Sequence, residues 1–120
     1  MTRIRYAVAA GTALLALVVG AAPATAATPT KLVGTVGPSF TITLKKGGKK
    51  VTTLKAGRYT ISVQDKSDFH NFHLTGPGVN KKTTVSEVKT KTWTVTLKKG
   101  TYRYVCDPHS SQMHGTLTVT

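Results

Sequence analysis

Hydrophobic and polar residues alternate with a period of two along most of the chain after residue 31. Four segments show this pattern clearly, with apolar side chains at every second position and threonine or serine between them: 40–44, 59–64, 92–97 and 116–120. This period is typical of a β-strand with one buried face, and threonine suits the exposed face of a sheet. The sequence therefore predicts strands whose apolar faces meet in one core.

Short turns rich in glycine and lysine separate these segments, at 45–50, 56–57, 75–78 and 99–100. The gaps are short enough for strands that follow one another closely along the chain. About seven or eight short strands between residues 27 and 120 predict an all-β protein. We expect an antiparallel Greek-key β-sandwich.

The N-terminal segment differs in composition from the rest of the chain. Arg3 and Arg5 precede an apolar run over 7–20, and small residues follow up to Ala26. This order predicts a secretory signal peptide at 1–26 and a single domain at 27–120. The apolar run is shorter than the roughly 20 residues of a membrane span. We therefore expect a secreted or extracytoplasmic protein of the periplasm or cell envelope, not an integral membrane protein.

The chain is strongly basic, with 17 Lys and Arg, 4 Asp and Glu and a formal net charge of +13. An exported protein meets little nucleic acid, so we expect none as a partner. An anionic cell-envelope polymer or an acidic protein fits the charge better. Because strands 59–64 and 101–105 both run toward the histidines and the cysteine, the lysines that precede them should lie at the opposite end. These lysines and one arginine are Lys55, Arg58, Lys98 and Lys99, and Lys45 to Lys50 should join them.

Cys106 is the single cysteine, so it forms no disulfide within the chain. A small exported domain without a disulfide needs another reason to keep a thiol. Cys106, His109 and Met113 share one short loop, and His70 and His73 lie on an upstream segment. Two histidines, a cysteine and a methionine form the donor set of a blue-copper electron-transfer site. Zinc prefers four strong ligands and makes no use of methionine.

The pair His70-Asn71 followed by Cys106-x-x-His109-x-x-x-Met113 resembles the small blue-copper proteins, the cupredoxins such as plastocyanin, amicyanin, pseudoazurin and azurin. The resemblance implies a β-sandwich that holds one Cu(I)/Cu(II) ion through His70, Cys106, His109 and Met113. It also implies that Asn71 supports the copper thiolate with a hydrogen bond. The implied function is an exported type 1 copper protein that carries single electrons, as a monomer, between redox protein partners of unknown identity.

The segment from His70 to Leu74 contains two histidines, and only one can serve as the upstream ligand. On a strand, His70, Phe72 and Leu74 share a face. Two large apolar side chains make that the inward face, so we expect His70 to point into the site and His73 to point away. We expect His73 and His114 to be ordinary solvated histidines near the site.

Other functions use the same residues. The alternative within metal chemistry is copper capture and delivery in the cell envelope, which the ligand types alone do not separate from electron transfer. A Cys–His hydrolase would need an orienting group, an oxyanion site and a substrate cleft, so we expect no enzyme activity. A third alternative is a module that adheres to acidic polymers, and only the basic charge supports it.

Overall fold

The computed structural model describes residues 9–23 and 27–120. The arginines at 3 and 5 and the predicted cleavage motif at 24–26 lie outside the described residues. Residues 9–23 form neither helix nor strand, and the fold is built by 27–120. Within the described ranges, no helix is long and apolar enough to cross a membrane.

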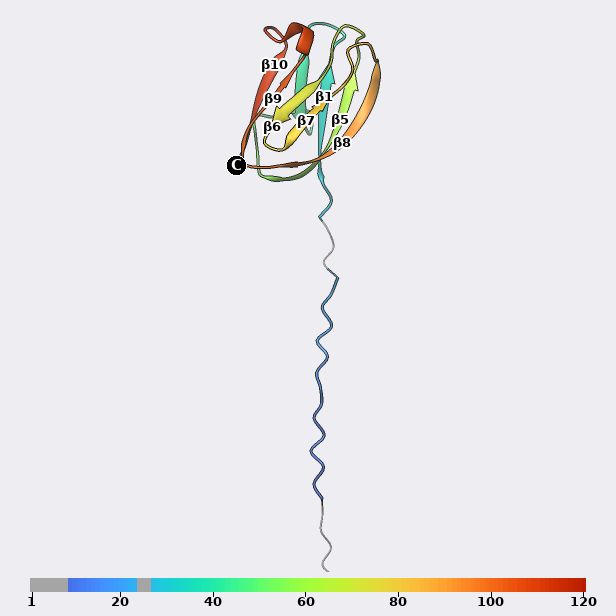
Figure 1. Cartoon of the computed structure of the whole chain (residues 1–120), viewed down its shortest axis with the longest axis vertical. Coiled ribbons are helices and arrows are strands. Elements are labelled where there is room, and N and C mark those ends of the chain that lie inside the picture. The colour runs from blue at the N-terminus through green and yellow to red at the C-terminus, as the bar shows by residue number, and fades with distance from the viewer. Residues whose placement is uncertain (1–8, 24–26) are drawn as a thin grey trace, which may run out of the picture.

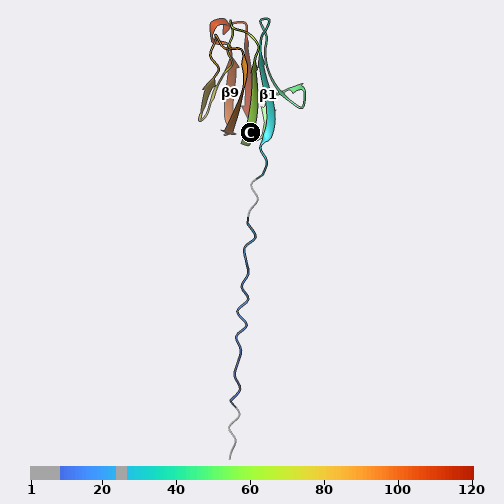
Figure 2. The same ribbon diagram turned by 90° about the vertical axis from the view of Figure 1, so that its right-hand side faces the viewer.

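Residues 27–120 form a sandwich of two five-stranded sheets packed face to face (Figures 1 and 2). The first sheet has the order β3-β2-β1-β5-β8, and the second has the order β4-β10-β9-β6-β7. The strands are β1 (Thr30–Val36), β2 (Ile42–Lys46), β3 (Lys49–Lys50), β4 (Thr53–Leu54), β5 (Gly57–Asp65), β6 (His73–Gly76), β7 (Val79–Lys82), β8 (Lys89–Leu97), β9 (Gly100–Val105) and β10 (His114–Val119).

The predicted all-β sandwich is confirmed, but its sheets are not purely antiparallel, and it has ten strands instead of the expected seven or eight. Both sheets are mixed, because β1 pairs parallel with β5 and β10 pairs parallel with β4. The parallel pairs arise because the chain leaves the first sheet after β3, adds β4 to the second sheet and then returns as β5. The count is ten because β3 and β4 are two residues each, within or next to a segment that reads as a turn.

The core lies between the sheets and follows the predicted alternation. Ile61 and Val63 on β5 are fully buried, while Thr60, Ser62 and Gln64, which alternate with them, are only half-buried. Tyr102 and Tyr104 on β9 are buried as well, and their rings lie where a Cβ on Gly76 or Gly115 would stand. Those two glycines therefore make room for the two largest buried side chains.

Strand direction brings the predicted site together. β1 and β5 run parallel, so the loops that follow Val36 and Asp65 leave the sandwich at one end. β9 also ends there, because β10 pairs antiparallel with it and returns to the C-terminus at the other end (Figure 1). Segments from three parts of the chain thus meet at the end that carries Cys106, which we call the copper end.

Candidate metal centre

Cys106 follows β9 directly and begins the loop that carries most of the candidate donors. A short 3₁₀ helix, Asp107–His109, has Pro108 in its first turn, where its ring fits the backbone and no N–H is missed. The His109 carbonyl accepts the Met113 N–H at 2.8 Å, and the Met113 carbonyl accepts the Cys106 N–H at 3.0 Å. These bonds close the loop on itself and fix the Cys106 and His109 backbones relative to each other.

His70 lies between β5 and β6 in a segment without regular secondary structure. The Asp65 carboxylate starts a chain of hydrogen bonds that holds this segment, because it accepts from the Thr83 hydroxyl at 2.7 Å. The same hydroxyl oxygen accepts the Phe72 N–H at 2.9 Å, two residues after His70. Burial raises the pKa of Asp65, and its hydrogen bond from Thr83 acts in the opposite direction.

Three donor atoms converge at the copper end. The Cys106 Sγ lies 3.6 Å from His70 Nδ1 and 3.6 Å from His109 Nδ1, and the two Nδ1 atoms are 3.1 Å apart. A point equidistant from these atoms lies about 2 Å from each, close to the usual length of metal bonds to imidazole and thiolate. Cys106 and His70 are buried, and His109 is half-buried. The donor set and its spacing therefore fit one metal ion.

Asn71 joins the two loops that carry the donors. Its Oδ1 accepts the Asp107 N–H at 2.8 Å, and its Nδ2 donates to the Asp107 Oδ2 at 2.8 Å. Burial acts to raise the pKa of Asp107, but hydrogen bonds from Asn71 and His73 outweigh it, so the pKa is lowered. The resemblance predicts that Asn71 supports the thiolate. In the structure, these two hydrogen bonds of Asn71 hold Asp107, the residue that follows Cys106.

His73 points away from the three donor atoms, in agreement with strand alternation, but the prediction of an ordinary solvated side chain is wrong. Its Nδ1 lies 2.9 Å from Asp107 Oδ1, and its Nε2 lies 2.7 Å from Asn80 Oδ1. The His73 side chain is 19% exposed. It therefore extends the Asn71–Asp107 bridge onto β7. His114 is exposed and bonds the Ser110 carbonyl at 3.0 Å, as expected of a surface residue.

Met113, the fourth predicted ligand, is buried in the core cluster that also contains Cys106. Its backbone closes the Cys106 loop through the two bonds described above. The structure thus places the Met113 backbone beside Cys106 and His109 and buries its side chain in the core.

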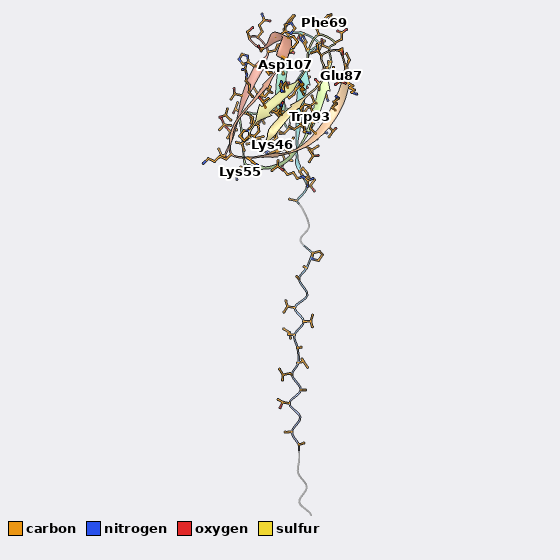
Figure 3. The ribbon with its side chains drawn as sticks, viewed as in Figure 1. Lys46, Lys55, Phe69, Glu87, Trp93 and Asp107 are labelled. Carbon is orange, nitrogen blue, oxygen red and sulfur yellow. The ribbon has the colours of Figure 1, made fainter. Side chains whose placement is uncertain are left out.

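An apolar collar surrounds His109 on the surface. We give this name to Pro38, Phe40, Phe69, Val85 and Pro108, which line a hollow of about 410 Å³ with His70, His109 and Asp68. The Phe40 ring stands edge-on to both imidazoles, with centroids 5.2 Å from His70 and 4.9 Å from His109. Phe69 is labelled at the top of Figure 3.

Alternation predicts Phe40 on the buried face of a strand, and this is wrong. β2 begins only at Ile42, and Phe40 is 61% exposed. The turn residues Gly37-Pro38-Ser39 precede it, and they are the signal by which the sequence places Phe40 in a loop.

The cupredoxin-like domain family matches residues 10–119, so the chain belongs to that family. The fold is similar to reduced rusticyanin, with a TM-score of 0.57 and 22% identity over 80% of this chain and 82% of that one. Rusticyanin from Thiobacillus ferrooxidans gives a TM-score of 0.52 and 25% identity over 75% and 76%.

An oxidised methionine-to-leucine variant of amicyanin gives a TM-score of 0.50 and 18% identity over 74% of this chain and 81% of that one. None of the curated proteins matches the sequence. A cupredoxin-like domain with this His–Cys–His cluster is able to bind a single copper ion.

Proposed function

We propose that the protein is an exported type 1 copper protein that carries single electrons between redox partners. The observation that carries this proposal is the triangle of Cys106, His70 and His109, in which two of the three donors are buried. A thiolate with two imidazoles is the trigonal donor set of blue-copper sites. A bound copper ion supplies one-electron chemistry by alternating between Cu(I) and Cu(II).

We assign Met113 as the fourth, weak ligand. The burial of its side chain supports this role, as do the backbone hydrogen bonds that join Met113 to Cys106 and His109. Its thioether would add a weak, soft donor to the thiolate and the two imidazoles. It is also the single methionine between residues 27 and 120.

The surrounding residues keep the donors in one arrangement. The loop bonds of Cys106 and the Asn71–Asp107 bridge hold both donor segments from the backbone side. Phe40 covers the imidazoles from the solvent side. A site held in this way changes little between two oxidation states, which favours fast electron transfer.

His109 is the half-exposed donor, and the apolar collar surrounds it. We infer that electrons enter and leave through His109 and that the collar contacts the redox protein partner. Among solved structures of similar fold, rusticyanin is described in a reduced state and a variant of amicyanin in an oxidised state.

The same burial argues against an enzyme. Cys106 has no exposed surface, so a substrate does not reach its sulfur as it would reach a nucleophilic thiol. We therefore infer a carrier without catalytic activity, made with a signal peptide over 1–26 and acting as the domain 27–120.

The test separates electron transfer from copper capture and delivery. The copper-loaded protein is reduced and reoxidised repeatedly in the presence of a Cu(I) chelator, and its copper content is measured after each cycle. An electron carrier keeps its copper and returns to the same spectrum. Loss of copper to the chelator in the first cycles would favour delivery and contradict the proposal.

A further inference from the structure

The charged residues divide the molecule into two unlike halves. All four acidic residues, Asp65, Asp68, Glu87 and Asp107, lie in the half that carries the copper end. Figure 3 shows Glu87 and Asp107 in this half and Lys46 and Lys55 at the opposite end. That opposite end, which we call the basic end, carries exposed Lys and Arg side chains at Lys31, Lys45, Lys46, Lys49, Lys50, Lys55, Arg58, Lys98 and Lys99.

The β2–β3 hairpin holds four of these lysines in fixed positions. Gly47 and Gly48 form its two-residue turn with φ of +56° and +78°, conformations that glycine adopts without strain. Lys45 stands opposite Lys50. Lys46 stands opposite Lys49. Like charges directly opposite each other destabilise a pair of strands. A surface needed only for solubility gains nothing from opposed lysines. An anion bound between them would reduce their mutual repulsion.

The lysines also border a hollow at the basic end. It has a volume of about 480 Å³ between Lys46 and Lys55, and Thr30, Thr53, Tyr59 and Thr120 line it as well. The Tyr59 hydroxyl donates to the Lys55 carbonyl at 2.6 Å, which fixes the wall of the hollow. Hydroxyl groups and two ammonium groups are suitable partners for a phosphate group.

We propose that the basic end binds a flexible polyanion with repeated phosphate groups, with the β2–β3 hairpin as the main contact. The proposal goes beyond electron transfer and does not depend on copper. The hairpin projects from the side of the sandwich (Figure 2), so the surface that its lysines offer is not flat. A flexible polymer can follow an uneven surface, whereas a flat partner such as a membrane contacts only part of it.

A lipid surface fits this end less well. Peripheral membrane binding combines basic residues with apolar side chains that enter the bilayer interface. Between residues 27 and 120, the exposed large apolar side chains are Phe40, Phe69 and Val88, and all three lie in the half with the copper end. A polymer bound at the basic end therefore leaves the apolar collar free for the redox partner.

The test measures binding of inorganic polyphosphate to the purified protein by isothermal titration calorimetry, with and without copper. One variant changes Lys45, Lys46, Lys49 and Lys50 to Gln. The matched control changes Lys66, Lys81, Lys82 and Lys89 to Gln, which removes the same charge from exposed positions in the other half. We expect the hairpin variant to bind at least about tenfold more weakly, with a smaller salt dependence, and the control to stay within about threefold.

Thermal unfolding without polymer provides a second readout. The hairpin variant should be as stable as the wild type or more stable, because the opposed lysines are gone, and this shows that lost binding is not lost folding. Equal weakening in both variants would mean that net charge alone acts and would overturn the proposal. Binding to phosphatidylglycerol vesicles without binding to polyphosphate would overturn it in favour of a membrane surface. The result is independent of copper, so its failure leaves the electron-transfer proposal standing.

Discussion

At the copper end, side chains from distant segments bond to one another, whereas at the basic end tight turns and strand ends place the charges. Asn71, His73 and Asp107, together with Asn80 on β7, connect three segments near the donors. The β2–β3 turn fixes its lysines within six residues of chain. The copper end should therefore be sensitive to single substitutions. The basic end should tolerate single substitutions and respond only when several charges change together.

The largest effect of a single substitution should come from His70. His70→Ala removes one of the three converging donors, and we expect copper affinity to fall by more than about 100-fold, which exceeds the usual effect of residues outside the ligand shell. Titration with Cu(II) at constant pH measures it. His73→Ala is the control and should leave the copper spectrum nearly unchanged. Loss of the spectrum in His73→Ala with retention in His70→Ala would show that the wrong histidine has been assigned.

The bridge between the donor loops provides the next comparison. Asn71→Ala leaves the Asp107 N–H and Oδ2 without their Asn71 partner, while Oδ1 keeps its contact with His73, so we expect the free energy of unfolding to fall by about 1 kcal/mol. Urea denaturation measures it. Asn80→Ala removes an exposed partner of His73 and should cost less. Equal losses in the two variants would mean that the bridge does not distinguish the copper end.

Met113→Leu should give a smaller effect, because a thioether would bind copper only weakly. The variant should keep its copper, and removing the thioether should raise the reduction potential by about 60 mV or more, a tenfold change in relative affinity for one electron. Cyclic voltammetry measures the shift. Loss of copper from Met113→Leu would instead assign the methionine a structural role in the loop.

The smallest effect should be the loss of stability at low pH that comes from Glu87. Glu87 accepts the Thr84 N–H and pairs with Lys91 at 2.6 Å and Lys89 at 3.4 Å. These contacts, first of all the one to Lys91, lower the pKa of Glu87 from 4.5 to about 2. Because the folded pKa lies below the unfolded one, the stabilisation is complete above pH 4.5 and is lost as the pH falls toward 2.

The comparison of wild type with Glu87→Gln tests this effect. The melting temperature of the wild type should be higher at pH 6, and the difference should shrink as the pH is lowered below 4.5. A difference that stays constant with pH would show that the carboxylate charge is not its cause.

Much of this molecule could be predicted from local pattern. The alternation that indicates strands gave the buried faces of β5 and β9, because one side of each strand packs on the core. It also separated His70 from His73: His70 is buried although it lies outside β6, and the His73 side chain is partly exposed.

Other features depend on contacts between distant residues. The parallel β1–β5 pairing follows from where the chain re-enters the first sheet, which the strand pattern does not encode. The contacts of His73 with Asp107 and Asn80 join β6, the Cys106 loop and β7. Phe40 continues an alternating pattern, yet it lies on the imidazoles, because β2 begins only at Ile42 and Phe40 belongs to the loop that follows β1.

The most direct test of the central claim is the visible absorption of the purified protein as Cu(II) is added. We expect an intense band near 600 nm, by resemblance to the blue-copper proteins, that saturates at about one copper per chain. Cys106→Ser is the control and should show no such band, because its hydroxyl stays protonated at neutral pH. A wild-type protein that binds copper without this band, or a band that persists in Cys106→Ser, would contradict the assignment of a copper–thiolate centre.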